Sequence, residues 1–241
     1  MKRIRSYAKK LIRRLVEPGI KESAYLKSGY PYRLFFWQAF TALRVNRIEG
    51  AYAEFGVYGA GSFSIAYRTA VEAHSLRRFW GFDSFKGLPE IEAGPDAHPR
   101  WSKGRFAASE DDFHAACVEN GVPRSAYDVV PGFFSDTLDK MSPAEPPTEI
   151  AFAHVDCDLY TSTVSVLNFL EPRLKNGMIV SFDDYHLWSS DQISGERRAF
   201  LELWAGHPKW HFEPFMPVSW HGASFVVEDR ALHPGSSSSR L

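Results

Sequence analysis

Short apolar runs alternate with longer amphipathic segments from residue 51 onward, and this alternation limits the fold more than any other feature of the chain. The apolar runs have the length of single strands, whereas the intervening segments repeat apolar residues at helical spacing. Such alternation is typical of βαβ units in a parallel sheet. We therefore expect an α/β fold with a mostly parallel sheet and helices on both faces. Strands are expected at 51–57, 78–83, 127–130, 150–155 and 178–182, and helices at 62–74, 111–121, 161–174 and 196–205.

Segments outside this alternation complete the expected organisation. Residues 209–228 read as two further strands, and the Ser-rich tail at 231–241 is expected to be disordered. The segment 34–43 is apolar nearly all round a helical wheel, so it should be buried or form an interface. The loop at 87–104 is rich in Pro and Gly and is long enough to be a lid over a site.

The first residues form a basic amphipathic segment that ends near Pro18. We expect residues 1–50 to be an N-terminal helical arm or lid, followed by one domain at 51–230. The apolar stripe of the basic helix would pack on this domain or on a second subunit, giving a homo-oligomer. The alternative is contact with anionic lipid or an acidic partner.

Charge and hydropathy exclude two classes of protein. Lys and Arg number 28 and Asp and Glu 29, so the net charge of −1 lacks the field of a nucleic-acid-binding protein. No apolar run approaches the roughly 18 residues of a membrane span, and Lys and Arg interrupt the first segment too often for a secretory signal. Cys117 and Cys157 are far apart without CxxC spacing, which argues against a disulfide framework and favours a cytoplasmic location.

A glycine-rich turn follows the first expected strand. Gly56, Gly59 and Gly61 have the spacing G-x-x-G-x-G, which differs from the G-x-G-x-x-G of dinucleotide-binding loops. Glycines let the backbone approach a ligand, and the following helix offers free N–H groups. Asp83, after the second strand, lies 22 positions beyond Gly61, an interval at which an acid can accept both hydroxyls of a ribose. Together these features favour a nucleoside-containing cofactor over a simple tight turn.

Four acids follow the fourth and fifth expected strands. Asp156 and Asp158 come directly after one strand, and Asp183 and Asp184 follow the next. Because the carboxyl ends of parallel strands form one rim, these side chains should converge beside the glycine turn. A cation would neutralise such a cluster, and oxygen ligands suit Mg²⁺, Ca²⁺ or Mn²⁺. The alternative is that the acids cap the following helices.

Five motifs, spread over roughly residues 30–230, together resemble the macrocin O-methyltransferase (TylF) family. They are EFGVYGAGS at 54–62, GFDSFKGLP at 81–89, PGFFSDTL at 131–138, DCDLYTST at 156–163 and DDY at 183–185. The resemblance implies a Rossmann-like class I methyltransferase fold with a seven-stranded sheet, and makes 51–230 the methyltransferase domain. It also implies S-adenosylmethionine as cofactor, usually with Mg²⁺, and sugar hydroxyls of natural products as acceptors.

The resemblance also implies roles for residues of four of the five motifs. The residues that match the cradle for the methionine end of the cofactor are Glu54, Gly56, Gly59, Gly61 and Ser62, while Asp83 matches the ribose-binding acid and Ser84 begins the loop beside it. The metal-binding acids match Asp156, Asp183 and Asp184. Asp158 matches a position proposed as the general base. His186 is a second candidate base, because an imidazole titrates near neutrality.

We therefore expect an S-adenosylmethionine-dependent O-methyltransferase that acts on a hydroxylated small molecule, such as the sugar moiety of a natural product, with Mg²⁺ orienting the acceptor. Two departures from the family stand out. Cys157 replaces a frequent Gly, and the segment 187–190 replaces a common Trp-Pro-Gly near the acceptor, so the acceptor stays open. Two alternatives are a nicotinamide oxidoreductase, disfavoured by the glycine spacing, and a non-catalytic cofactor-binding protein, disfavoured by the paired acids.

Overall fold

The computed structural model describes residues 30–91, 94–187 and 189–232 of the chain. The strands are β1 (Ala51–Phe55), β2 (Phe79–Asp83), β3 (Tyr127–Pro131), β4 (Ile150–Val155), β5 (Ile179–Phe182), β6 (Trp210–Pro214) and β7 (Ala223–Asp229). The α-helices are α2 (Tyr30–Val45), α3 (Gly61–Glu72), α4 (Glu110–Glu119), α5 (Tyr160–Leu170) and α6 (Gly195–Leu203). Short 3₁₀ turns occur at Arg124–Ala126, Leu138–Lys140, Glu171–Arg173 and Arg230–Leu232.

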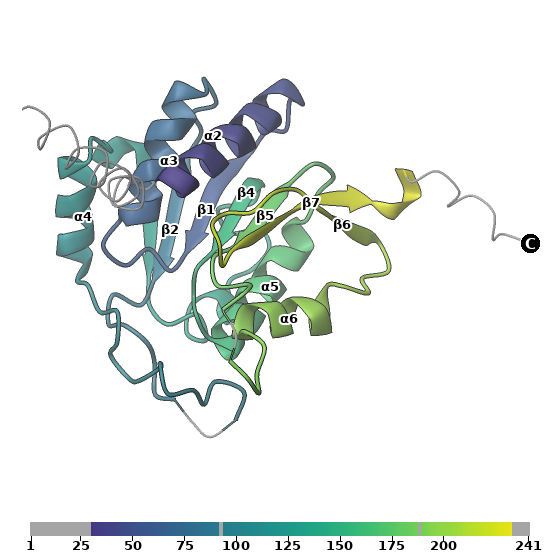
Figure 1. The fold of residues 1–241 in the computed structure, drawn as a ribbon. Coiled ribbons are helices and arrows are strands. Elements are labelled where there is room, and N and C mark those ends of the chain that lie inside the picture. Colours follow the sequence, from purple (N-terminus) through teal and green to yellow (C-terminus); the bar gives the residue numbers. More distant parts are fainter. Residues whose placement is uncertain (1–29, 92–93, 188, 233–241) are drawn as a thin grey trace, which may run out of the picture.

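The strands form one sheet in the order β3-β2-β1-β4-β5-β7-β6 (Figure 1). Strands β1 to β5 are parallel, whereas β7 runs antiparallel to both of its neighbours, β5 and β6. The chain builds the sheet outward from β1 in one direction and then from β4 in the other. In open α/β sheets, ligands bind at the carboxyl ends of the strands beside such a reversal. The predicted seven-stranded, mostly parallel sheet is therefore confirmed.

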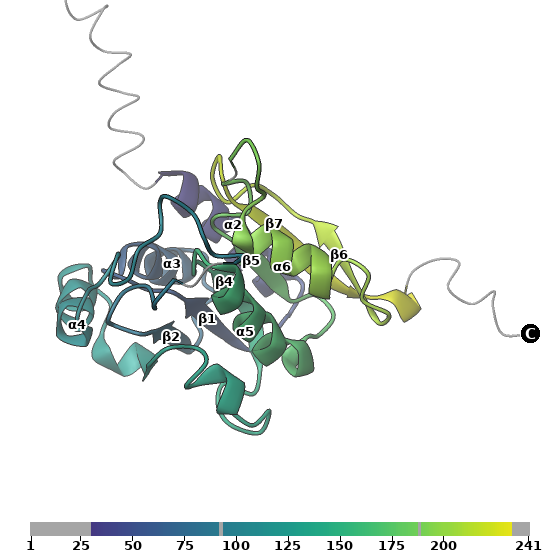
Figure 2. The ribbon, with the colours of Figure 1, turned by 90° about the horizontal axis from the view of Figure 1, so that it is seen from below.

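Helices cover both faces of the sheet, with α2, α3 and α4 on one face and α5 and α6 on the other (Figure 2). Alternate side chains of each strand supply the two cores. On the first face, Phe36 of α2 packs edge-on against Tyr52 of β1, with ring centroids 6.1 Å apart. On the opposite face, Phe55 of β1 packs edge-on against Phe169 of α5.

The expected helices and strands from residue 51 to 229 are all present, with ends displaced by a few residues. The apolar helix at 34–43 is the middle of α2, and its Phe35 and Phe36 are buried against the sheet. The described residues of 87–104 contain neither helix nor strand, as predicted. Residues 1–29 and 233–241 lie outside the described residues, so the basic arm, the disordered tail and the division at residue 50 stay predictions.

Candidate active site

A cavity of about 350 Å³ lies at the carboxyl ends of the central strands, where the topology predicts a ligand site. Its wall combines the turn after β1, the loop after β2, residues 132–134 after β3 and the turns after β4 and β5. Segments that are far apart in the sequence therefore meet around one space. A cavity of this size is typical of small-molecule sites.

Gly56 lets the end of β1 pass close to the turn after β4. Its φ of 92° lies in the left-handed region, and a Cβ at this position would lie 1.8 Å from the carbonyl oxygen of Asp156. Only glycine avoids both the strain and the clash. This change of backbone direction ends β1 at Phe55, two residues before the expected end.

The next two glycines of the turn have a different character. A Cβ at Gly59 or Gly61 would meet no atom within 4 Å, so packing does not require glycine at either position. Between them, Ala60 adopts a left-handed conformation, with φ 60°, and α3 begins at Gly61. The missing side chains leave the N-terminal end of α3 uncovered, where free N–H groups can bind a ligand.

Asp83 ends β2 and holds the glycine turn in place. Its Oδ2 accepts hydrogen bonds from the backbone N–H groups of Val57 and Tyr58 at 2.9 and 3.0 Å. Its Oδ1 accepts a hydrogen bond from the N–H of Phe85 at 2.8 Å, and the residue lines the cavity. An ionised carboxylate has about four acceptor positions, so Asp83 can still accept a hydroxyl of a ligand.

Glu54 lies behind the glycine turn, fully buried. Its two carboxylate oxygens accept hydrogen bonds from the hydroxyls of Tyr52 and Ser62. Burial raises the pKa of Glu54 to about 8, although these two hydrogen bonds act in the opposite direction. Glu54 therefore anchors the first turn of α3 to β1.

The predicted cofactor residues divide into two groups. Gly56, Asp83 and Ser84 line the cavity. In the described part of the chain, the cavity wall does not include the other four, whose binding role stays a prediction: Glu54, Gly59, Gly61 and Ser62. The wall also includes three residues of the PGFFSDTL motif for which sequence analysis predicts no role: Gly132, Phe133 and Phe134.

The four predicted acids, Asp156, Asp158, Asp183 and Asp184, all line the same cavity. Because β5 ends at Phe182, Asp183 and Asp184 lie beyond the strand and reach the same space. Burial, reinforced by neighbouring acids, raises the pKa of Asp158 to about 8 and that of Asp156 well above its usual value. Burial also raises the pKa of Asp183 to about 6, although the nearby His221 lowers it.

Helix capping does not explain these acids. The N-cap residues of α5 and α6 are Leu159 and Ser194. Asp158, next to the first of them, has a φ of 61°, a conformation that few non-glycine residues adopt. The acids therefore converge on the cavity, as predicted, without serving as the N-caps of the helices that follow.

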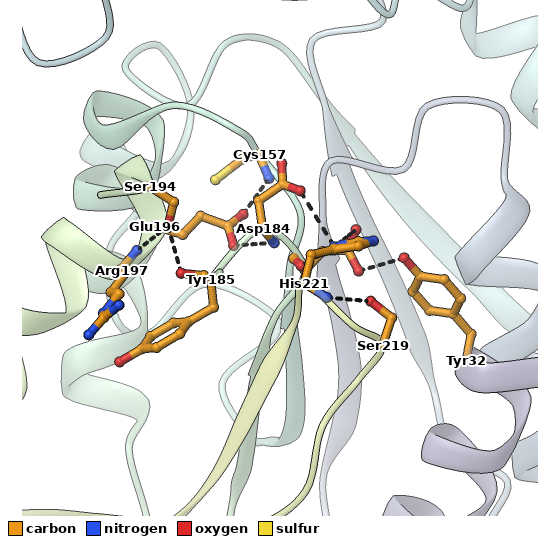
Figure 3. Close-up of polar contacts among 10 residues, drawn as sticks. Tyr32, Cys157, Asp184, Tyr185, Ser194, Glu196, Arg197, Ser219 and His221 are labelled. Carbon is orange, nitrogen blue, oxygen red and sulfur yellow. Dashed lines mark hydrogen bonds and ion pairs between the residues drawn. The ribbon is translucent and has the colours of Figure 1, made fainter. Parts of the chain in front are cut away.

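His221, from the segment between β6 and β7, joins this acidic group (Figure 3). Its Nδ1 lies 3.8 Å from Oδ2 of Asp183 and 3.7 Å from Oδ1 of Asp184. One ligand atom from each of the three residues lies within 4.8 Å of the others, an arrangement that could hold a metal ion. Carboxylate and imidazole donors both occur in divalent metal sites. Sequence patterns offer little reason to prefer His221 over other histidines, because the segment before it carries no strand-end signal.

Tyr32 of α2 also contacts this acidic group (Figure 3). Its hydroxyl donates a hydrogen bond to Oδ1 of Asp183 at 2.8 Å. Burial and the adjacent Asp183 raise the pKa of Tyr32 above its usual value, so the hydroxyl stays a donor. The helix that precedes the predicted domain thus contributes directly to the acidic end of the cavity.

His186, the second candidate base, lies beside the site. Its backbone N–H donates to the carbonyl oxygen of His221 at 2.6 Å, and its ring packs edge-on against Tyr185. Burial and the nearby Arg197 lower its pKa. The described cavity wall includes Asp158 and does not include His186, so of the two candidate bases only Asp158 borders the described cavity.

The loop between β2 and α4 borders the cavity through Leu88, Pro89 and Phe106. It also reaches the start of α5 through the buried Asp96, whose carboxylate accepts hydrogen bonds from the N–H groups of Tyr160 and Thr161. The predicted lid loop therefore lies beside the site and is tied to the helix that follows Asp158. Whether it opens and closes stays a prediction.

Glu196, in the first turn of α6, is an acid of this region that sequence reasoning missed. It is fully buried, and its two carboxylate oxygens accept hydrogen bonds from the N–H groups of Cys157 and Asp184 (Figure 3). Burial, with Asp184 and Asp183, raises the pKa of Glu196 well above its usual value, whereas the hydrogen bond from Asp184 lowers it. An acid in the first turn of a helix looks like ordinary helix chemistry, so the sequence carried no signal for this contact.

In the described part of the chain, every helix is too short or too polar to serve as a membrane span, in agreement with the hydropathy of the sequence.

Comparison with known proteins identifies the family of this chain. Residues 33–199 match the model of the Macrocin-O-methyltransferase (TylF) family. An 8-demethyl-8-(2,3-dimethoxy-alpha-L-rhamnosyl)-tetracenomycin-C 4'-O-methyltransferase from Streptomyces olivaceus is 36% identical over 145 residues, which cover 57% of this chain and 54% of that protein. Demethyldecarbamoylnovobiocin O-methyltransferase from Streptomyces niveus is 32% identical over 151 residues, covering 58% and 54%. The chain spans about half the length of these curated relatives.

The structure of the O-methyltransferase NovP resembles this one with a TM-score of 0.66 and 24% identity, over 83% of this chain and 80% of that chain. This likeness confirms the Rossmann-like class I methyltransferase fold. The family match includes the glycine turn, Asp83 and all four acids of the cavity. The match covers well over half of the sequence, and the chain therefore belongs to the macrocin O-methyltransferase (TylF) family.

Proposed function

We propose that this protein is an S-adenosylmethionine-dependent O-methyltransferase that methylates a hydroxyl of a small molecule, such as a sugar moiety of a natural product. One observation carries the proposal: Gly56 of the glycine turn, Asp83 and four carboxylates all line a single cavity. The glycine turn and Asp83 suit a nucleoside, and the carboxylates suit an acceptor hydroxyl. Family membership favours methyl transfer over the hydride transfer of a nicotinamide enzyme.

The cofactor half of the cavity fits a ligand with a ribose. Asp83 can still accept a ribose hydroxyl, Gly56 lets the backbone approach the ligand, and Phe133 offers an apolar wall for a base. S-adenosylmethionine, when bound, supplies a methyl group on a positively charged sulfur. The N-terminal end of α3, left uncovered at Gly59 and Gly61, can bind the carboxylate of its methionine end.

The acidic half fits a divalent cation. Burial raises the pKa values of Asp156 and Asp183, and neighbouring acids raise them further, so a cation would stabilise the ionised carboxylates. Asp156, Asp183 and Asp184 would hold Mg²⁺, which supplies a Lewis acid that lowers the pKa of an acceptor hydroxyl. His221 adds a nitrogen donor to the oxygen donors, so Mn²⁺ is a second candidate.

Asp158 is the proposed general base. It lines the cavity beside Asp184, and its pKa of about 8 lies close to the pH at which a proton acceptor works efficiently. One carboxylate oxygen of Asp158 would take the proton of the acceptor hydroxyl as the acceptor oxygen attacks the methyl carbon.

Two observations support a sugar-bearing acceptor. Trp101 and Tyr160 line a hollow of about 30 Å³ that adjoins the main cavity at Asp158 and Asp184; the hollow is too small for a sugar ring, but these aromatic side chains border the acidic part of the site. Aromatic faces beside polar groups suit a sugar ring. The tetracenomycin relative is named for methylation of a rhamnosyl compound. A cytoplasmic location and oligomerisation through the N-terminal helices stay predictions.

Titration of S-adenosylhomocysteine into metal-stripped protein, before and after Mg²⁺ is added, tests this function. We expect Asp83→Ala to weaken binding of S-adenosylhomocysteine about 10-fold or more, because a charged acceptor is lost. Asp183→Ala should bind S-adenosylhomocysteine normally, lose the separate Mg²⁺ event and lose methyl transfer to a panel of glycosylated acceptors. The exposed Asp139→Ala is the control. Failure of the unaltered protein to bind S-adenosylhomocysteine at millimolar concentration would refute the proposal.

A further inference from the structure

We propose that Glu196 is a positioning residue that sets the separation of the two acid-bearing turns and thereby the affinity of the site for a divalent cation. The inference rests on the proposed function, because it assumes that the acids bind a cation. Glu196 lies outside the described cavity wall, and it is not among the residues proposed to hold the cation. Its basis is the two hydrogen bonds of the Glu196 carboxylate.

The two oxygens of Glu196 hold two different turns. Oε1 accepts from the backbone N–H of Cys157 at 3.2 Å, and Oε2 accepts from the backbone N–H of Asp184 at 2.8 Å (Figure 3). Cys157 lies between Asp156 and Asp158 after β4, and Asp184 follows β5. One carboxylate thus joins the turns that carry all four acids of the cavity.

The start of α6 is built to place this carboxylate. A Cβ on Gly195 would lie 2.5 Å from the backbone nitrogen of Tyr160, so only glycine lets α6 approach the start of α5 this closely. Ser194 caps α6 by accepting from the N–H of Arg197, and its hydroxyl donates to the carbonyl oxygen of Tyr185. The helix is therefore fixed at the residue before and the residue after Glu196.

Both oxygens of Glu196 face N–H donors, and this requirement separates a carboxylate from its amide. Glutamine has the same length and nearly the same volume, yet it offers one acceptor oxygen and one donor nitrogen. Its NH₂ group would face a backbone N–H, which leaves one turn without its acceptor. Aspartate keeps two acceptor oxygens and loses one methylene. A positioning role therefore predicts that Asp replaces Glu better than Gln does, whereas a role in filling space predicts the reverse.

A cation site depends on the residues that orient its ligands. Outer partners of metal ligands typically change metal affinity about 10- to 100-fold when they are replaced. Glu196 holds backbone atoms next to Asp156, Asp158 and Asp183, so its loss should move several ligands together. Among the described residues, no hydrogen bond joins Glu196 to the glycine turn or to Asp83, so we expect binding of S-adenosylhomocysteine to be preserved.

The experiment measures Mn²⁺ binding by the loss of the free-ion electron paramagnetic resonance signal, with S-adenosylhomocysteine binding and thermal unfolding measured on the same samples. We expect Glu196→Gln to weaken Mn²⁺ binding about 10- to 100-fold, and Glu196→Asp to weaken it less, with S-adenosylhomocysteine affinity within about twofold of the parent in both. The matched control is Glu202→Gln, because Glu202 lies on the same helix and also accepts two hydrogen bonds, from Tyr160 and Arg198, outside the acidic group.

A second control separates positioning from stability. Ser109→Ala removes the cap of α4, which lies on the other face of the sheet from Glu196, so it should lower the melting temperature without weakening Mn²⁺ binding. If Glu196→Gln is too unstable to purify, Glu196→Asp is compared with Ser109→Ala, and only the former should weaken Mn²⁺ binding.

Four outcomes overturn the inference. The first is a Mn²⁺ affinity of Glu196→Gln within twofold of the parent, and the second is tighter Mn²⁺ binding by Glu196→Gln than by Glu196→Asp; both refute the inference while the proposed function stands. Equal Mn²⁺ affinities of Glu196→Asp and Ser109→Ala refute it as well. If the unaltered protein binds S-adenosylhomocysteine and no Mn²⁺, the metal part of the proposed function fails together with the role of Glu196.

Discussion

Asp96 and Tyr160 are joined by a hydrogen bond across 64 positions of sequence, in which the Asp96 Oδ1 accepts from the Tyr160 backbone N–H at 2.6 Å. Asp96 also accepts from the backbone N–H and the hydroxyl of Thr161. These groups are the unsatisfied donors at the start of α5, which its own N-cap, Leu159, does not satisfy. A side chain of the loop over the cavity thus serves as the missing cap of the helix that follows Asp158.

Removal of this contact should loosen the loop and the helix start together. We expect Asp96→Ala to lower the free energy of unfolding by about 1 kcal/mol, the usual cost of a lost helix cap. Limited proteolysis should cleave the loop at 87–104 several times faster than in the parent. The exposed Asp139→Ala is the control and should change neither measurement. An unchanged cleavage rate in Asp96→Ala would show that the loop is held by its other contacts.

Tyr32 should support the cation site from α2. Its hydroxyl donates to Oδ1 of Asp183, so Tyr32→Phe leaves that oxygen without a fixed donor. We expect Mn²⁺ affinity to fall about 10-fold, with S-adenosylhomocysteine affinity unchanged. Tyr160→Phe is the matched control for metal binding, because its hydroxyl donates to Glu202, away from the acidic group. Equal Mn²⁺ affinities for the two variants would contradict this role.

The parts of the site that follow from strand order were predictable from the sequence. Gly56 and Asp83 each lie at or just after the end of a strand, and so do the acids at 156, 158, 183 and 184. In a parallel sheet, position at a strand end already fixes the rim on which a residue lies. Local patterns therefore placed these residues around one cavity without knowledge of any side-chain contact.

The remaining site residues depend on how remote segments pack. His221 comes from a connection between two antiparallel strands, and Tyr32 lies on a helix that precedes the sheet. Asp96 occupies an irregular loop, and Glu196 resembles an ordinary acid in the first turn of a helix. No periodicity or spacing in the sequence places these residues beside the acids. Glu54 shows the converse case, because the family resemblance implied a place at the methionine end of the cofactor, whereas its carboxyl group is buried and accepts a hydrogen bond from Tyr52.

The buried Glu54 should make stability depend on pH. Its pKa is about 8 in the folded protein and 4.5 ordinarily, so the folded state holds a proton that the unfolded chain releases between these values. The stability contributed by this proton is complete below about pH 4.5 and is lost as the pH rises toward 8.

We expect the free energy of unfolding of Glu54→Gln to fall less steeply than that of the parent over this range, because glutamine does not titrate. Denaturant unfolding at pH 5, 6, 7 and 8 measures the difference, which should grow with pH in favour of the variant. Acids such as Asp158 titrate in both proteins and cancel in the comparison. The exposed Glu119→Gln should follow the parent at every pH. Parallel curves for Glu54→Gln and the parent would show that Glu54 stays ionised in the fold.

The two kinds of glycine in the turn after β1 should respond differently to the same substitution. Gly56→Ala places a methyl group 1.8 Å from the Asp156 carbonyl oxygen at a φ of 92°, so we expect a loss of about 3 kcal/mol or more in the free energy of unfolding. Gly59→Ala meets no atom within 4 Å and should change stability by less than about 1 kcal/mol. If S-adenosylmethionine occupies the open space there, Gly59→Ala should weaken binding of S-adenosylhomocysteine about 10-fold. Normal affinity in Gly59→Ala would place the methionine end of the cofactor elsewhere in the cavity, and a stable Gly56→Ala would contradict the close approach of β1 and β4.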